Sequence, residues 1–359
     1  MPILLHRSTL SCDDILLVPQ YNTVKSRLDT DISTKISKHI PISHPIVSTN
    51  MSTVTDINMI KAMWDTGSTG ILHRFMKTNE IKNKSIALNK YRFEKITDTN
   101  HYPIIISIGV KEEDIKTLSM IEKIFDTCKI DAIMIDLAHA DSSYVYDMIK
   151  TIRNIFGHNL DIIVGNIATR EAAKRMCDSD IDAVRIGIGG GSCCSTRVTT
   201  GFGISTLQSI IDCNDVCQKY EMPIIADGGI KTSGDIAKLL AFGADCCTVG
   251  TLLAGTSESP FDVIEMDGVK YKKVFGMASK EAQELYKDGL KPGTAPEGIS
   301  RYIKYTGDTK QVIAELTGGI RSAFTYAGAR NLKEFKQNAE YTILSNGGML
   351  ESKYLKNSI

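Results

Sequence analysis

A glycine-rich segment with two adjacent cysteines is the part of this 359-residue sequence with the clearest chemical potential. Residues 187–197 read Gly-Ile-Gly-Gly-Gly-Ser-Cys-Cys-Ser-Thr-Arg, so four glycines precede the thiols of Cys193 and Cys194. A cysteine attacks as its thiolate and therefore needs a lowered pKa or a neighbouring base, neither of which a sequence displays. The pattern predicts a flexible loop that carries a nucleophile; the alternative is a turn of small residues with two incidental thiols.

Glycines gather at two further places, each directly after a short apolar run. Asp227-Gly228-Gly229 follows one run, and Gly250-Thr251 follows the next. Backbone N–H groups approach a phosphate closely where glycine leaves room, and barrel enzymes use this at the ends of their last strands. The glycine-rich ends therefore indicate a phosphate site, with ordinary turns between strands and helices as the alternative.

Eight short apolar runs alternate with helical patterns and must position these residues. The runs cover residues 45–48, 69–73, 103–107, 132–136, 161–165, 183–187, 223–227 and 246–250. Near-continuous apolar runs suit strands that are buried on both faces of a parallel sheet. Intervening segments such as 169–180 and 233–242 begin with Thr or Ser, which are good helix caps. The pattern predicts an α/β fold, a (β/α)8 TIM barrel, with a doubly wound open sheet as the alternative.

In a barrel, the residues that follow the strands carry the chemistry. Besides the glycine-rich ends, these positions hold Asn50-Met51-Ser52, His73-Arg74, Ser107, Asp136 and Gly165-Asn166. The predicted strands thus place these residues in one polar site at the carboxyl end of the barrel.

The composition excludes several classes of protein. The 42 Lys and Arg residues balance 42 Asp and Glu residues, so the basic excess of a general nucleic-acid binder or of a polybasic membrane-surface protein is absent. No stretch approaches the roughly 18 uncharged apolar residues of a membrane span, and the first residues do not resemble a secretory signal. We therefore expect a cytoplasmic protein with no nucleic-acid or membrane partner. We expect Trp64 and the pairs Cys213/Cys217 and Cys246/Cys247 in the core.

Several motifs together resemble the IMP dehydrogenase/GMP reductase family. They are the cysteine loop, residues 227–230 (Asp-Gly-Gly-Ile), 250–259 (Gly-Thr-Leu-Leu-Ala-Gly-Thr-Ser-Glu-Ser), 13–19 (Asp-Asp-Ile-Leu-Leu-Val-Pro) and 50–55 (Asn-Met-Ser-Thr-Val-Thr). The matching motifs run from about residue 11 to residue 330. The family is a (β/α)8 barrel that acts on purine nucleotides, so the resemblance implies the same fold as the strand pattern.

The resemblance implies a role for each matching residue. Cys194 would be the nucleophile that forms a covalent thioimidate at C2 of the purine, while Cys193 packs. Thr196 and Glu297 would pass a proton to the departing amine. The implied substrate contacts are Met51, Ser192, Asp227, Gly228, Gly229, Gly250, Thr251, Gly276, Met277, Ser279 and Gly298. The implied nicotinamide-cofactor contacts are Ser107, Asp136 and Ser279, and the carbonyls of Gly187 and Gly189 would bind a monovalent cation, K⁺. A homotetramer is implied in the same way.

The two branches of the family differ in how the covalent adduct is resolved. Dehydrogenases hydrolyse it with an Arg-Tyr pair on a long mobile flap, whereas the flap expected here, about residues 278–300, has Tyr286 but no arginine. Glu297 aligns with the reductase glutamate. About 30 residues separate His73 from Pro103, so the regulatory CBS pair that many dehydrogenases insert there is absent.

These features predict a GMP reductase, which converts GMP into IMP and ammonia with NADPH. We expect a single domain over residues 1–359, without a CBS insertion and with a C-terminal tail over about 340–359. The alternative is a CBS-less IMP dehydrogenase that oxidises IMP to XMP with NAD and takes its base from Arg301-Tyr302. Features that depart from the reductase pattern are the dehydrogenase-like residues 346–352, Ser52, Thr294 and Pro296. A third hypothesis is a catalytically silent nucleotide-binding barrel.

Overall fold

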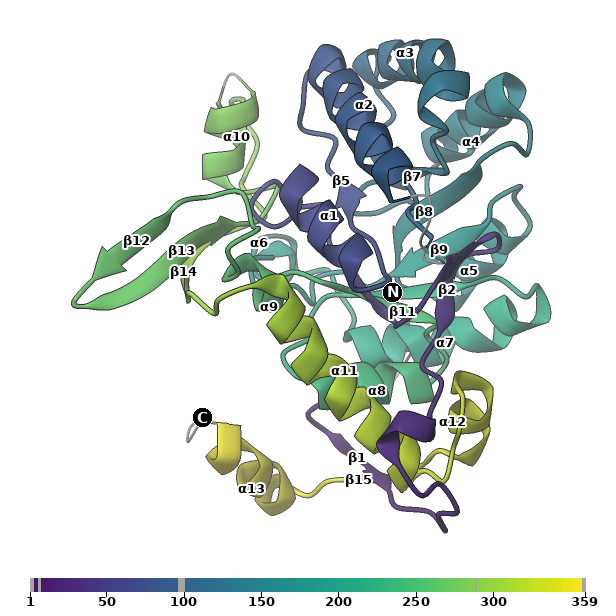
Figure 1. Ribbon diagram of the computed structural model, residues 1–359, viewed down its shortest axis with the longest axis vertical. Coiled ribbons are helices and arrows are strands. Elements are labelled where there is room, and N and C mark those ends of the chain that lie inside the picture. The colour runs from purple at the N-terminus through teal and green to yellow at the C-terminus, as the bar shows by residue number, and fades with distance from the viewer. Residues whose placement is uncertain (1–2, 6–7, 96–100, 288, 357–359) are drawn as a thin grey trace.

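A parallel sheet rolls into a barrel at the centre of the protein (Figure 1). The computed structural model describes residues 3–5, 8–95, 101–287 and 289–356. In order around the sheet, the strands are β4 (Ile46–Ser48), β11 (Cys246–Val249), β10 (Ile224–Asp227), β9 (Ala183–Ile186), β8 (Asp161–Ile167), β7 (Ala132–Asp136), β6 (Ile105–Ile108) and β5 (Ile71–Leu72).

A single parallel bridge closes the ring. It joins Ser48 at the end of β4 to Gly70 beside β5, and Ser48 N donates to Thr69 O at 3.1 Å. The predicted (β/α)8 barrel is confirmed. The doubly wound alternative is wrong, because an open sheet would leave its two edge strands apart.

Helices follow the strands and cover the outer face of the barrel (Figure 1). They are α1 (Ile57–Asp65), α2 (Thr78–Glu94), α3 (Glu112–Cys128), α4 (Ser143–Phe156), α5 (Arg170–Cys177), α7 (Thr206–Lys219), α8 (Ser233–Ala241) and α11 (Thr309–Tyr326), with the shorter η1 (Arg27–Asp29) and α12 (Leu332–Asn338) beside them. Thr169 caps α5 by accepting from Ala172 N, and Thr232 caps α8 by accepting from Asp235 N. The helices predicted within residues 169–180 and 233–242 are confirmed.

Side chains alternate along the barrel strands between two buried layers. Cys246 belongs to the cluster inside the barrel, whereas its neighbour Cys247 packs in the layer between strands and helices. Trp64, Cys213 and Cys217 are fully buried in that outer layer. Their predicted place in the core is confirmed.

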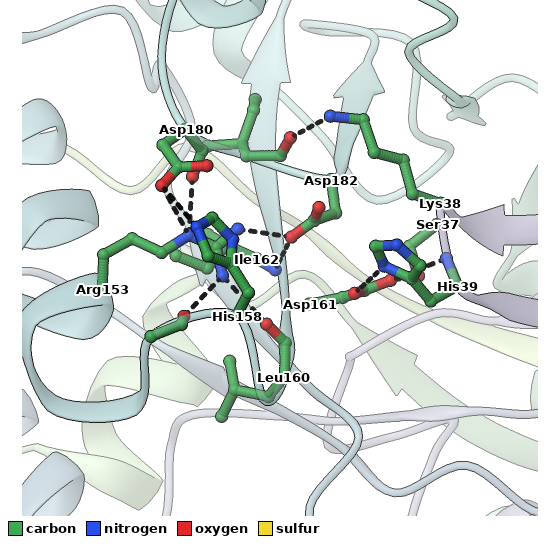
Figure 2. A network of polar contacts seen from close by, with 12 residues as sticks. Ser37, Lys38, His39, Arg153, His158, Leu160, Asp161, Ile162, Asp180 and Asp182 are labelled. Atoms are coloured by element: carbon green, nitrogen blue, oxygen red, sulfur yellow. Dashed lines mark hydrogen bonds and ion pairs between the residues drawn. The ribbon is translucent and has the colours of Figure 1, made fainter.

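A short hairpin closes the amino-terminal end of the barrel. It consists of β2 (Thr34–Ser37) and β3 (Ile40–Ile42), whose isoleucines enter the inner core. The carboxylate of Asp161 fastens it, because Asp161 accepts from Ser37 Oγ at 2.5 Å and bonds His39 Nδ1 at 2.7 Å (Figure 2). This end of the molecule is therefore structural.

A second sheet projects from the barrel at its other end (Figure 1). Its antiparallel strands are β12 (Val263–Met266), β13 (Val269–Phe275) and β14 (Ser300–Lys304). Lys272 fastens β13 to the loop that follows residue 254, because its buried Nζ donates to Thr256 O at 2.8 Å and to Ser259 O at 2.7 Å. Backbone carbonyl oxygens thus accept the hydrogen bonds that water would accept from an exposed ammonium group.

The predicted flap and tail both contain regular structure. Between β13 and β14, α10 (Lys280–Tyr286) lies over the loop after β5, where the Tyr286 ring is 6.0 Å from that of His73 and 6.1 Å from that of Phe75. In the tail, β15 (Glu340–Ile343) pairs with β1 (Ile15–Val18), and α13 (Asn346–Lys356) follows. Tail residues 357–359 lie outside the described residues. The mobility of the flap and the limits of a single domain stay predictions. No described helix is both long and apolar enough to cross a membrane.

Candidate active site

The thiol of Cys194 lies in a chain of polar contacts at the carboxyl end of the barrel. The glycine loop leaves β9 and leads into α6 (Thr196–Thr200). Cys194 Sγ lies 3.2 Å from Thr196 Oγ1, and Thr196 Oγ1 donates to Glu297 Oε2 at 2.8 Å. A hydroxyl accepts and donates at once, so this arrangement can pass a proton between thiol and carboxylate. Burial raises the pKa of the neighbouring Cys193 thiol, which suits its predicted packing role.

An extended segment keeps Glu297 within reach of the loop. Ile299 N donates to Cys193 O at 3.0 Å, and Cys194 and Gly298 form an antiparallel bridge. The backbone pairing therefore holds Thr196 and Glu297 together, although 101 positions separate them in the sequence.

The predicted substrate contacts Gly276 and Met277 follow β13 directly. Gly276 N donates to Ile299 O at 3.2 Å, which joins this stretch to the segment that bears the glutamate. Met277 Sδ accepts from Ser52 N at 3.2 Å, so Met277 contacts the residue that follows Met51 in the sequence. The structure thus brings these predicted substrate contacts together around the cysteine loop.

Ser279 stands at the start of α10 and is fully buried. Its Oγ accepts from Ala282 N at 3.1 Å, so the hydroxyl caps the helix. Its backbone also bridges Gly298. A direct contact of Ser279 with substrate or cofactor stays a prediction.

Glycines and two hydroxyls meet at the end predicted to bind phosphate. Ser192 Oγ and Thr251 Oγ1 lie 2.5 Å apart, where α9 (Thr251–Ala254) begins after Gly250. Gly228 has a φ of +90°, and a Cβ there would lie 2.9 Å from Gly191 N, so a larger residue would push the two loops apart. The predicted residues that converge here are Ser192, Gly228, Gly229, Gly250 and Thr251.

Asp227 ends β10 with both carboxylate oxygens engaged. Thr248 Oγ1 donates to Oδ1 at 2.7 Å, and Asn166 Nδ2 donates to Oδ2 at 2.7 Å. The same Asn166 amide donates to Gly187 O at 2.5 Å. The Gly187 carbonyl thus accepts one hydrogen bond and, like any backbone carbonyl, has a second lone pair. The predicted cation ligands are this carbonyl and that of Gly189. Cation binding by these two carbonyls stays a prediction.

A buried arginine links the predicted cofactor contacts Ser107 and Asp136. Arg185 of β9 donates to Asp136 and, through Nη1, to Asn50 Oδ1 at 2.5 Å, while Asn50 Nδ2 donates to Ser107 Oγ at 3.0 Å. Burial acts to raise the pKa of Asp136, but Arg185 and Arg74 outweigh it, and the net pKa is lowered. An ionised carboxylate at a strand end suits a ribose hydroxyl, so the residues present fit a nicotinamide cofactor.

Arg185 is a site residue that the sequence analysis missed. Its signal was a charged side chain within the apolar run Ala183-Val184-Arg185-Ile186. A buried charge needs partners, so such a residue indicates a polar network inside the barrel.

A further polar cluster lies at the amino-terminal end of the barrel (Figure 2). Ligand atoms of His39, Asp161 and Asp182 lie within 4.8 Å of one another. Asp182, however, accepts from Arg153 Nη2 at 2.5 Å and from Ile162 N at 2.8 Å, and a guanidinium so close opposes a cation. A cavity of about 610 Å³ beside the cluster contains no predicted site residue in its lining. We assign this cluster to fastening the hairpin.

Comparison with known proteins decides the family. A model of the IMP dehydrogenase / GMP reductase domain matches residues 9–354. The chain belongs to this family. It is therefore an oxidoreductase of purine nucleotide metabolism, from a family that uses a nicotinamide cofactor.

Relatives of both kinds resemble the chain over most of its length. It is 33% identical to the inosine-5'-monophosphate dehydrogenase of Cryptosporidium parvum, over 96% of this chain and 94% of that protein. It is 30% identical to the enzyme of the same name from Borreliella burgdorferi, over 98% of each. It is 28% identical to the GMP reductase of Leishmania donovani, over 96% of each. These comparisons establish the family and leave the branch to the chemistry of the site.

Proposed function

We propose that this protein is a GMP reductase, which converts GMP into IMP and ammonia with NADPH through a covalent adduct on Cys194. The observation that carries the proposal is the polar chain from Cys194 through Thr196 to Glu297, with distances of 3.2 and 2.8 Å. A reductase needs an acid for the departing amine, and this carboxylate lies two contacts from the thiol. The expected flap, residues 278–300, contains no arginine that could activate water.

In the proposed reaction, the Cys194 sulfur bonds to C2 of the purine and its proton passes through Thr196 to Glu297. Glu297 then returns a proton to the amine as the C2–N bond breaks and ammonia leaves. NADPH, when bound, supplies the hydride that replaces the sulfur at C2, and the thiolate is released. The C–S electron pair leaves on sulfur, and the thiolate takes a proton from solvent before the next turnover.

The remaining predicted contacts then take their places around the nucleotide. Ser192, Gly228, Gly229, Gly250 and Thr251 bind the phosphate, and Asp227 accepts from the ribose hydroxyls. Met51, Gly276, Met277 and Gly298 border the base, and Ser107, Asp136 and Ser279 border the cofactor. The family resemblance also supports a cytoplasmic homotetramer and bound K⁺, neither of which enters a step above.

A CBS-less IMP dehydrogenase is the second candidate. The observation that favours it is the approach of Arg301 Nη1 to Ser192 O, at 3.4 Å, because this places a guanidinium beside the cysteine loop. The dehydrogenase would need that group to activate water at the covalent adduct.

The test supplies purified protein with GMP and NADPH and follows the absorbance of the cofactor at pH 7.5. A parallel assay supplies IMP and NAD and detects XMP chromatographically. We expect oxidation of NADPH that depends on GMP and yields IMP and ammonia in equal amounts. Formation of XMP without any GMP-dependent oxidation of NADPH would overturn the proposal in favour of the dehydrogenase.

A further inference from the structure

The proposed phosphate site is built from neutral groups. Ser192 and Thr251 offer hydroxyls, and the neighbouring glycines offer backbone N–H groups. The second pKa of a phosphate monoester is about 6, so the group carries about 1.5 to 2 negative charges at neutral pH. Guanidinium groups bind such a phosphate with paired, charge-assisted hydrogen bonds.

Arg301 places a guanidinium at the edge of this site. It stands on β14 opposite Val274 of β13, and its Nη1 donates to Ser192 O at 3.4 Å. The side chain is exposed, and no carboxylate in the described parts of the chain forms an ion pair with it. Most of its N–H donors are therefore free for a ligand.

The backbone explains why Arg301 arrives at Ser192. Residues 297–301 run antiparallel to the cysteine loop, with Ser195 N donating to Glu297 O and Ile299 N donating to Cys193 O, each at 3.0 Å. Two residues further along the segment, Arg301 faces the start of the loop. One extended stretch thus places Glu297 at the thiol end of the site and Arg301 at the phosphate end, about 13 Å apart along the strand.

We propose that Arg301 binds the 5′-phosphate of the purine nucleotide together with Ser192 and Thr251. The inference rests on the proposed nucleotide site and deepens it, since it assigns recognition of the phosphate charge to one side chain. It also gives Arg301 a role other than activating water beside Cys194.

The test combines two changes, separately and together: Arg301→Gln removes the guanidinium charge from the protein, and a nucleoside replaces the nucleotide so that the ligand has no phosphate. Values of kcat/KM are measured for GMP and guanosine with NADPH, or for IMP and inosine with NAD if that pair turns over. We expect Arg301→Gln to lower kcat/KM for the nucleotide about 10- to 100-fold through KM, the scale of lost charged hydrogen bonds. The value for the nucleoside should stay within about twofold, because no phosphate is present to lose its partner.

Two further variants sharpen the comparison. Arg301→Lys keeps the charge without the paired donors and should lie between wild type and Arg301→Gln. Lys304→Gln removes a cation from the same strand and should leave both ligands unaffected. Calorimetric titration with GMP and guanosine repeats the comparison without turnover.

Equal losses for nucleotide and nucleoside would make Arg301 a structural residue and overturn the inference. No loss for either ligand, or a loss in kcat at saturating nucleotide with KM unchanged, would overturn it as well. Turnover of IMP in place of GMP would overturn the proposed reductase, yet the difference between nucleotide and nucleoside would still support the role of Arg301.

Discussion

Thr196 links a thiol to a carboxylate that does not touch it. Its Oγ1 lies 3.2 Å from Cys194 Sγ and donates to Glu297 Oε2 at 2.8 Å, so one hydroxyl serves both neighbours. In the proposed reaction the three side chains act as a single proton-transfer unit, so substitutions within the unit should not act independently.

Replacement of the nucleophile should separate binding from chemistry. Cys194→Ala should abolish turnover, because no other group can form the covalent adduct, while Kd for GMP stays within about tenfold, or 1.4 kcal/mol. Steady-state assays and calorimetry measure the two effects. Cys193→Ala, which removes the adjacent buried thiol, is the control and should retain turnover. Loss of GMP binding in Cys194→Ala would show instead that the thiol is structural.

Replacement of the acid should slow departure of the amine. Glu297→Gln should lower kcat about 10²- to 10⁴-fold with little change in KM, because the carboxylate takes the thiol proton and returns it to the amine only during the chemical steps that release ammonia. Rapid-quench detection of ammonia measures that step. Thr196→Val should cause a similar loss, and the double variant should be no worse than either single one. Glu284→Gln, on the exposed side of α10, is the matched control. A change confined to KM would contradict the acid role.

Residue type and spacing were enough to predict the loop with Cys193 and Cys194 and the glycine-rich strand ends, whereas only the family resemblance singled out Cys194 as the nucleophile. The contact between Thr196 and Glu297 spans 101 positions, so only the family resemblance could suggest it. Arg185 escaped prediction because its role depends on Asn50, Asp136 and Asn166, which arrive from three other strands. A single charged residue in an apolar run does not reveal its partners.

At the scale of elements, β13 connects the two halves of the site. Its far end leads into Gly276 and Met277, while Lys272 in its middle fastens the loop after α9. The buried ammonium group of Lys272 therefore attaches the strand that leads into Gly276 to the loop after α9.

Removal of that ammonium should loosen the attachment. Lys272→Met should lower the free energy of unfolding by about 2–4 kcal/mol, because carbonyls of Thr256 and Ser259 lose buried donors. Urea unfolding followed by circular dichroism measures the change. Lys273→Met, one position along on the more exposed face of β13, should change it by less than about 0.5 kcal/mol. Equal effects of the two variants would contradict this account.

The barrel strands could be predicted, whereas those of the projecting sheet could not. Strands buried on both faces read as continuous apolar runs, as residues 103–107 do. β12 is exposed along its whole length, and β13 reads Val-Lys-Tyr-Lys-Lys-Val-Phe, so its charged residues hide the strand. The sequence signal that apolar runs pass over is the turn Asp267-Gly268, which joins β12 to β13 as a two-residue hairpin.

At the scale of the whole molecule, two buried histidines link stability to pH. Burial lowers the pKa of His44 and of His73 from 6.5 to about 4, and neither Nδ1 atom has a hydrogen-bond partner. The unfolded chain therefore binds more protons than the folded protein between pH 4 and pH 6.5. The free energy of unfolding should fall as the pH falls through this window, by up to about 1.4 kcal/mol per pH unit for each histidine.

Urea unfolding at pH 7, 6 and 5 measures this dependence. His44→Gln should make the slope shallower, because one of the two titrating groups is gone, even if the variant is less stable at every pH. A slope that is identical in wild type and His44→Gln would contradict the assignment.

The bridge between Ser48 and Gly70 is the weakest strand junction of the barrel, and we call it the seam. The other neighbouring strands share ladders of paired residues, whereas β4 and β5 meet at one bridge. Any side chain at position 70 would enter this seam as a wedge, because its Cβ would lie 2.2 Å from Ser48 Oγ. The chain segments that leave the seam carry Met51 and His73, so widening it would move Met51 relative to His73 and to the Tyr286 ring that contacts it. A residue larger than glycine at position 70 would therefore strain the one junction that closes the ring while the other strand pairings stay in place.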